Sequence, residues 1–155
     1  MEHHQEHQMK GSYTSLAIEL VIDFIIMYLV MYTMIATADH FYLNINNVYM
    51  TLMMVAPMAI IMLVAMRSMF PSRKLNVIIV IGASIIFGAS IAAMRTQGAV
   101  GNEQFLRSMI PHHSGAILMC EQASITDSDI ANLCAGIIQG QTEEIAQMQD
   151  MLKRY

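Results

Sequence analysis

The sequence predicts an all-α membrane protein in which three transmembrane helices precede a helical hairpin. Three apolar stretches come first, each about as long as a helix needs to cross a bilayer, which is roughly 20 residues. Two amphipathic helical patterns follow, with a short polar segment between them. The composition agrees with this class, because 55% of the 155 residues are hydrophobic and only 13% are charged.

The charge and the sulfur-bearing residues narrow the function classes. A net charge of −4 without a basic stripe argues against nucleic acid as a partner. The two cysteines do not form a C-x-x-C pair, which argues against a zinc ribbon or a thioredoxin-like centre. The seventeen methionines serve either flexible packing or the binding of soft metals.

Residues 1–14 form a polar tail that carries His3, His4 and His7. His3 and His7 lie one helical turn apart, so together with Met9 they could bind a metal ion. The alternative is a disordered tail that binds divalent ions only opportunistically. The tail does not resemble a secretory signal, because its charges are mixed and no cleavage-like site follows the apolar run.

The transmembrane region covers residues 15–95, and its first span covers 16–38. Glu19 and Asp23 lie one turn apart on this span. Acids inside a membrane usually face a partner or a wet cavity. We favour the alternative that both acids lie near the helix N-terminus, at the headgroups, where the helix dipole favours negative charge.

The second predicted span, 48–70, contains a methionine stripe. Its members recur every four residues: Met50, Met54, Met58, Met62 and Met66. The stripe is either a path for a soft metal or flexible packing against lipid and neighbouring helices. Packing is favoured, because no charged residue or histidine interrupts the stripe. Pro57 should bend this span, which membrane helices tolerate.

The third predicted span, 75–94, has small residues four apart, Ser84 with Gly88 and Gly88 with Ala92. This spacing permits close approach between helices.

The loop charges predict the orientation. Loop 67–74 holds three basic residues and loop 39–47 holds none, so 67–74 is expected in the cytoplasm by the positive-inside rule. The N-terminus is then cytoplasmic, and the C-terminal hairpin is periplasmic or extracellular, at the inner (plasma) membrane of a bacterium. Asp39 and His40 share the side of the hairpin and could add ligands to a site there.

Residues 96–101 form a linker with two glycines, and the hairpin occupies 102–155, with helical patterns over about 102–124 and 128–153. Three residues are N-cap candidates for the second helix: Thr126, Asp127 and Ser128. Folding the hairpin about residue 127 makes Cys120 and Cys134 neighbours. They could form a disulfide in an oxidising compartment, remain two buried thiols, or bind a metal as thiolates.

The stretch MIPHHSGAILM sets His112 and His113 behind a proline and brackets them with Met109 and Met119. Thioether and imidazole together suit a soft or borderline metal such as copper or silver. The same folding brings Glu144 and Met148 of the second helix close to the histidines. The alternative, two ordinary helix histidines with methionine packing, accounts less well for an adjacent pair that faces carboxylates. The candidate ligands are Met109, His112, His113, Met119, Glu144 and Met148.

These residues carry a family resemblance. FLRSMIPHHSGAILMCEQA followed by IIQGQTEEIAQMQDML, within residues 102–153, resembles the CopM-like family, long filed as a domain of unknown function. Its members are ferritin-like helical bundles, exported or membrane-tethered, and several are associated with copper or silver binding and tolerance. The resemblance implies a ferritin-like fold with a Met/His site for Cu(I), Cu(II) or silver. It implies ligands at Met109, His112, His113 and Met119, with Glu144 and Met148 as contributors.

A single hairpin departs from fuller family members, which can supply four helices in one chain. Two helices bury little apolar surface, so we expect the hairpin to pair with another subunit and form a four-helix bundle. The small residues of the third span would assist this homodimer or higher even oligomer.

The expected function is a non-enzymatic, membrane-anchored metal-binding protein that captures copper or silver on the outer face. It would serve buffering, tolerance or delivery to a copper-handling protein. One alternative is a copper transport component that uses the methionine stripe, and another is a structural membrane oligomer with incidental metal affinity. A di-iron redox enzyme is disfavoured, because the hairpin has no E-x-x-H motif.

Overall fold

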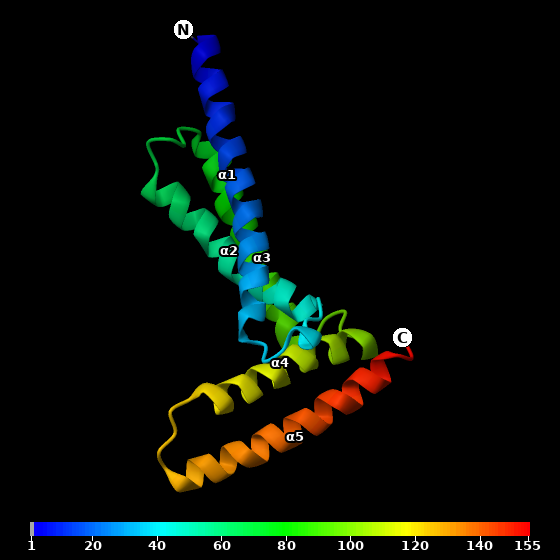
Figure 1. Ribbon diagram of the computed structural model, residues 1–155. Helices are drawn as coiled ribbons and strands as arrows, with labels where there is room; N and C mark the ends of the chain where they lie inside the picture. The colour runs from blue at the N-terminus through cyan, green and yellow to red at the C-terminus, as the bar shows by residue number, and fades with distance from the viewer. Residues whose placement is uncertain (1) are drawn as a thin grey trace. The chain divides into compact units, whose positions relative to one another are not determined.

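The computed structural model describes residues 2–155, with side chains from Ser12 onward, and this part of the chain is helical without a strand (Figure 1). The α-helices are α1 (Glu2–Val30), α2 (Ile45–Ala65), α3 (Arg73–Thr96), α4 (Asn102–Gln122) and α5 (Ser128–Leu152). Two short 3-10 helices, Met31–Met34 and Ala38–His40, lie between α1 and α2. The predicted all-α class is confirmed.

The chain divides into two compact units. The three-helix unit comprises the residues up to Leu29 together with Val48–Gly98, and the hairpin unit comprises Val30–Asn47 and Ala99–Tyr155.

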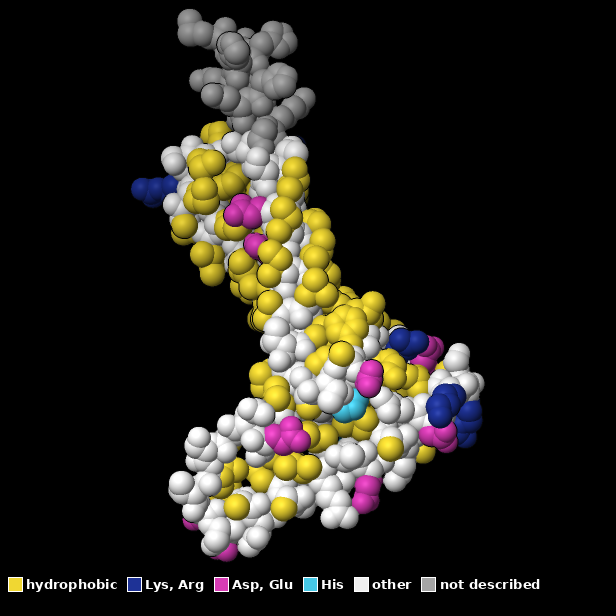
Figure 2. Space-filling model, viewed as in Figure 1, with side chains coloured by type: hydrophobic (Ala, Val, Ile, Leu, Met, Phe, Trp, Pro, Cys, Tyr) yellow, Lys and Arg dark blue, Asp and Glu magenta, His cyan; other side chains and the backbone are white. Residues whose placement is uncertain are grey.

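Three helical segments are long and apolar enough to cross a membrane: Ser12–Met34, Ile45–Ala65 and Arg73–Thr96. Their mean hydropathies are 2.0, 2.2 and 2.5, yet only 6%, 28% and 11% of their most apolar windows are buried within the chain. Apolar side chains therefore face outward, and Figure 2 shows them over the visible surface of the three-helix unit. An outward apolar surface of this extent suits lipid and is not expected in water.

The ends of the first two spans differ from the prediction. Helix α1 begins at Glu2, inside the predicted polar tail, and the side chains of His3, His4, His7 and Met9 lie outside the described residues. It ends at Val30 rather than at residue 38, because the chain turns there through a 3-10 helix into an extended Ile35. The hydroxyl of buried Tyr32 donates to the Tyr42 carbonyl at 2.8 Å and holds this turn.

Helix α2 ends at Ala65 rather than at residue 70. Phe70 turns inward and packs with Leu16 of α1 and Leu63 of α2. Pro71 follows at once, and a residue before proline is disfavoured in helical geometry. The helix itself continues through Pro57.

The three-helix unit packs through small and aromatic residues. Ala56 and Ala59 of α2 form one cluster with Ala83 of α3. The Tyr13 hydroxyl of α1 donates to Asn76 Oδ1 of α3 at 2.7 Å. The predicted small-residue stripe at Ser84, Gly88 and Ala92 lies on the exposed side of α3 instead. A Cβ added at Gly88 would meet nothing within 4 Å, so the close approach predicted there is not made within the described chain.

In the hairpin unit, α4 and α5 run antiparallel and are joined by residues 123–127 (Figure 1). Asp127 caps α5, since its carboxylate accepts from the backbone N–H groups of Asp129 and Ile130. Cys120 and Cys134 form a disulfide with their Cα atoms 5.3 Å apart. The apolar core lies between the two helices and comprises Leu106, Ile110, Ile117, Ile145 and Met148.

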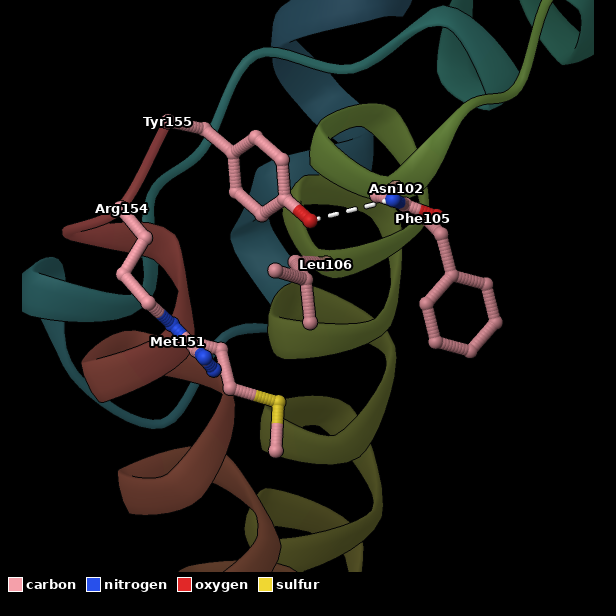
Figure 3. A pocket seen from close by; sticks show the side chains of 6 residues that line it. All are labelled: Asn102, Phe105, Leu106, Met151, Arg154 and Tyr155. Atoms are coloured by element: carbon pink, nitrogen blue, oxygen red, sulfur yellow. Dashed lines mark hydrogen bonds between the residues drawn. The ribbon is translucent and has the colours of Figure 1, made fainter.

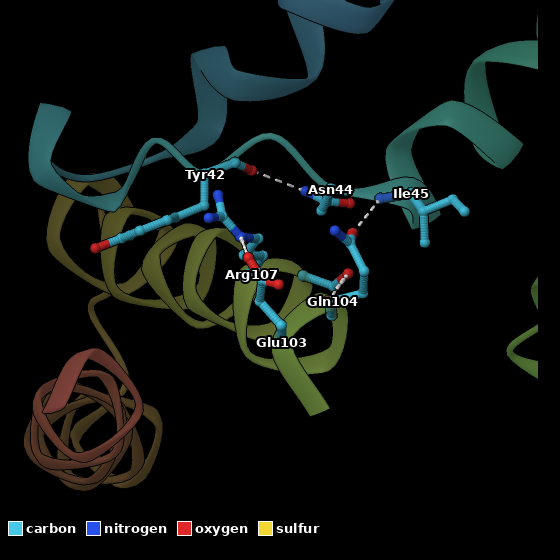
Figure 4. A network of polar contacts seen from close by, with 7 residues as sticks. Tyr42, Asn44, Ile45, Glu103, Gln104 and Arg107 are labelled. Atoms are coloured by element: carbon cyan, nitrogen blue, oxygen red, sulfur yellow. Dashed lines mark hydrogen bonds and ion pairs between the residues drawn. The ribbon is translucent and has the colours of Figure 1, made fainter. Parts of the chain in front are cut away.

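The segment between α1 and α2, residues 31–44, packs on the hairpin and is called the connector here. Its Ala36 and Tyr42 pack against the hairpin core. Close by, the Ile45 N–H donates to Gln104 Oε1 of α4 at 3.0 Å (Figure 4). Gly115 of α4 permits this contact, because a Cβ there would lie 3.4 Å from the Met34 carbonyl oxygen.

Candidate metal centre

The two adjacent histidines of α4 point in different directions. Successive residues of an α-helix point about 100° apart, so only one of the two faces α5. His113 does so and is 8% exposed, whereas His112 is exposed. The ring centroids lie 6.1 Å apart. The two predicted histidine ligands therefore point in different directions from α4.

Both ring nitrogens of His113 lie against oxygen atoms. Nδ1 is 2.9 Å from the Met109 carbonyl oxygen, and Nε2 is 2.8 Å from Oε2 of Glu144 on α5. A carbonyl oxygen only accepts, so Nδ1 carries the hydrogen. The contact between Nε2 and the carboxylate is a hydrogen bond, or an ion pair where the ring is protonated, and both atoms are of types that bind metal ions.

Two methionines lie one helical turn from this pair, one on each helix, and both are on the side away from the loop that joins α4 to α5. Met109 lies one turn before His113 and packs against the hairpin core, and Met148 lies one turn after Glu144 and belongs to that core. The core encloses the His113 side, while the Glu144 side chain is 56% exposed. The arrangement therefore offers sulfur, nitrogen and oxygen donors at the edge of an apolar cluster.

Four of the six predicted ligands gather at this point: Met109, His113, Glu144 and Met148. The other two do not. His112 is exposed, and Met119, seven residues further along α4, is 62% exposed. Among the residues that the structure describes, no three His, Cys, Asp or Glu side chains lie close enough to hold a metal ion. One chain alone therefore presents a histidine–glutamate pair with two thioethers.

The cysteines take no part in this centre. Both are joined in the disulfide, which removes the alternatives of two free thiols and of a thiolate metal site.

Ser114 has a role that sequence reasoning did not predict. It is fully buried, and its Oγ accepts from the Ala36 N–H at 2.7 Å and lies 2.8 Å from Nδ1 of His40. Burial lowers the pKa of His40, and the nearby Asp39 opposes this shift. In the neutral form the Ser114 hydroxyl donates to Nδ1, so His40 holds the connector onto α4. A serine within an apolar helical pattern carries no sequence signal for such a contact.

A hollow at the open end of the hairpin has a different lining (Figure 3). Its residues are Asn102, Phe105, Leu106, Met151, Arg154 and Tyr155. Asn102 Nδ2 donates to the Tyr155 hydroxyl at 3.1 Å and links the start of α4 to the end of the chain. This lining provides apolar surface and one thioether, and it lacks the histidine and carboxylate of the centre halfway along the hairpin.

Comparisons with known proteins find a family domain that includes the hairpin. The domain of unknown function DUF305 matches residues 84–152, which cover α4, α5 and the end of α3. The uncharacterized protein L153 of Acanthamoeba polyphaga mimivirus is 37% identical over 112 residues, which are 71% of this chain and 72% of the viral protein. That match is longer than residues 99–155, so it extends into the three-helix unit. No solved structure matches the chain.

Proposed function

This chain carries a DUF305 domain and belongs to the same family as the mimivirus protein L153, and we propose that it binds metal ions. The protein is a membrane-anchored, non-enzymatic metal-binding protein that captures copper or silver ions. The observation that carries this proposal is the contact between His113 Nε2 and Glu144 Oε2, which has a methionine one helical turn away on each helix. The resemblance to copper-associated CopM-like proteins supports the choice of metal.

The donor set fits copper and silver. The Met109 carbonyl holds the Nδ1 hydrogen of His113 and so directs Nε2 toward the bound ion, as outer partners of metal-bound histidines commonly do. The thioethers of Met109 and Met148 suit Cu(I) and Ag(I), whereas imidazole and carboxylate also serve Cu(II). Hard ions such as magnesium or calcium would find too few oxygen atoms here.

The proposed place of capture is the outer face of a bacterial inner (plasma) membrane. The positive-inside rule puts the N-terminus in the cytoplasm and the hairpin on the periplasmic or extracellular side. The disulfide supports this orientation, because such bonds persist in oxidising compartments. Captured metal would be buffered there or passed to a copper-handling protein.

The test is metal binding by the full chain in mild detergent. Equilibrium dialysis against Ag⁺ and Cu²⁺ compares the parent with His113→Ala and Glu144→Gln, and Thr142→Ala on the exposed side of α5 is the matched control. We expect His113→Ala to weaken binding by at least about tenfold, the scale at which lost metal contacts commonly act. Glu144→Gln should weaken Cu²⁺ more than Ag⁺, because the hard carboxylate matters less to the softer ion. Equal metal retention by parent and His113→Ala would refute the site.

A further inference from the structure

The hairpin has one covered side and one uncovered side. The connector covers the first, where Ala36 and Tyr42 pack on the core. The uncovered side is called the open face here. Its apolar members are between 40% and 63% exposed: Phe105, Met119, Ile130, Leu133 and Met151. Phe105 of α4 and Met151 of α5 line the same hollow, so both helices contribute exposed apolar side chains to this side of the hairpin (Figure 3).

Each helix contributes a row with a spacing of seven residues, which makes a nearly straight line along a helix. The α4 row is Phe105, His112 and Met119. The α5 row is Ile130, Ile137, Glu144 and Met151. Each row is apolar apart from one polar member in its interior. That member is His112 in one row and Glu144 in the other.

Three contacts set the register of α4 against α5. They are the disulfide between Cys120 and Cys134, the His113–Glu144 contact and the hydrogen bond from Asn102 to Tyr155. In this register the members of the two rows lie at matching heights along the hairpin. Phe105 is level with Met151, His112 with Glu144, and Met119 with Ile137.

We propose that the open face binds the open face of a second copy of this chain, about a twofold axis parallel to the helices. Rotation about such an axis leaves heights unchanged and lays α4 of each copy on α5 of the other, running antiparallel. The apolar ends of the rows then meet, and His112 of each copy meets Glu144 of the other. The product is a four-helix bundle in which neighbouring helices are antiparallel.

Charge complementarity selects this axis. A twofold axis across the helices would instead lay α4 on α4 and α5 on α5. The two carboxylates of Glu144 would then approach each other, which is unfavourable for like charges in a partly dry interface. With the axis parallel to the helices, the imidazole of His112 and the carboxylate of Glu144, which are the polar members of the two rows, pair with each other twice.

Resting on the proposed function, this assembly completes the metal centre. The His113–Glu144 pair of one chain lacks a third His, Cys, Asp or Glu within the described residues. The second copy supplies His112 at the height of Glu144. Each dimer then contains two equivalent centres, each with His113 and Glu144 from one copy and His112 from the other.

The contact surface is tested without metal by the mass of the full chain in mild detergent. We expect native mass spectrometry to show a dimer for the parent. Leu133→Asp, on the open face, should convert it to a monomer. The matched control is Ala135→Asp, which is exposed on the other side of the same helix and should leave the dimer intact. A monomeric parent, or a Leu133→Asp variant that stays dimeric, overturns the proposed surface.

The shared centre is tested by mixing two defective copies that carry different purification tags. Homodimers of His112→Ala and homodimers of His113→Ala each lack both centres. A mixed dimer retains one intact centre, because the intact His112 of one copy meets the intact His113 and Glu144 of the other. We expect one Ag⁺ per mixed dimer, two per parent dimer and none in either homodimer.

The outcomes separate the two proposals. A His112→Ala homodimer that retains Ag⁺ overturns the shared centre and leaves metal binding within one chain. A mixed dimer without Ag⁺, beside a parent that binds it, also overturns the shared centre. A parent that is dimeric but binds no Ag⁺ overturns the proposed function and the shared centre, and the Leu133→Asp comparison still decides the surface.

Discussion

Methionine occurs in two different settings in the two units of this molecule. In the three-helix unit, Met50 and Met54 of α2 and Met66 just after it are about 40% exposed among other apolar side chains. In the hairpin unit, Met109 and Met148 pack from two helices beside a histidine and a carboxylate. The same thioether has apolar neighbours in the first setting, and a histidine and a carboxylate close by in the second.

The difference teaches that neighbours decide what an excess of methionine does. A thioether alone binds metal weakly and fills irregular space well, so the α2 stripe is explained as flexible packing toward lipid. The exposure of Met50, Met54 and Met66 does not favour an enclosed path, which the alternative of a copper transport component would need. The hairpin methionines have an imidazole and a carboxylate beside them, and this supports a centre.

The largest expected effect is on stability, and it compares a buried isoleucine of the hairpin unit with an exposed isoleucine of the three-helix unit. Ile110 is fully buried in the hairpin core, whereas Ile85 of α3 is 65% exposed on the surface that suits lipid. Ile110→Ala should lower the free energy of unfolding of the hairpin by about 2–5 kcal/mol, because it removes packed methylene groups and leaves a cavity. Ile85→Ala should change stability by less than ~0.5 kcal/mol. Thermal unfolding followed by circular dichroism compares the two variants, and equal losses would mean that α3 is packed more closely than its exposure indicates.

The next effect concerns the two methionine settings directly. Met109→Leu with Met148→Leu keeps side-chain volume, so folding should change little, while the affinity for Ag⁺ should fall by about tenfold, or ~1.4 kcal/mol. The matched control, Met54→Leu with Met58→Leu, should leave the affinity unchanged. A competition assay with a coloured silver or copper chelator measures both. The comparison between the units fails if the α2 double variant loses affinity as much as the hairpin variant.

The smallest expected effect concerns the connector, through His40. Burial lowers the pKa of His40 below its ordinary value of 6.5, so the unfolded chain takes up a proton at a higher pH than the folded chain does. Stability is then greatest above that ordinary value and declines as the pH falls toward the folded pKa. His40→Gln should flatten this dependence between about pH 7.5 and pH 5 without moving the transition of the three-helix unit. An unchanged slope in the variant would assign the acid sensitivity to another group.

Hydropathy and helical periodicity were sufficient to predict the helices, because composition and spacing directly reflect what surrounds a helix. They did not predict the ends of α1 and α2. Residues 35–38 are as apolar as a span, and only contacts with α4, such as that of Ser114 with Ala36, remove them from the helix. Helix α2 likewise stops short of Phe70, which packs with Leu16, and Pro71 was the one local signal against helix there. The family match also begins earlier than expected, at residue 84 within α3 rather than at 102.

Part of the candidate centre was predictable. Folding the hairpin about residue 127 placed the cysteines together and brought Glu144 within a turn of the histidines, and the disulfide and the His113–Glu144 contact both agree with that register. The divergence of His112 from His113 follows from helical geometry alone and could have been derived from the sequence. The role of Ser114 could not, because it depends on how the connector folds back.

The placement of the disulfide has a mechanical consequence. The two hairpin helices are joined covalently near their turn, by Cys120 and Cys134, and by one side-chain hydrogen bond at the far end, from Asn102 to Tyr155. If the two helices separate, the distance between them must therefore increase with distance from the cysteines. The His113–Glu144 contact lies partway along the arms. An ion that held these two side chains further apart would separate the far ends of α4 and α5 by more than that increase.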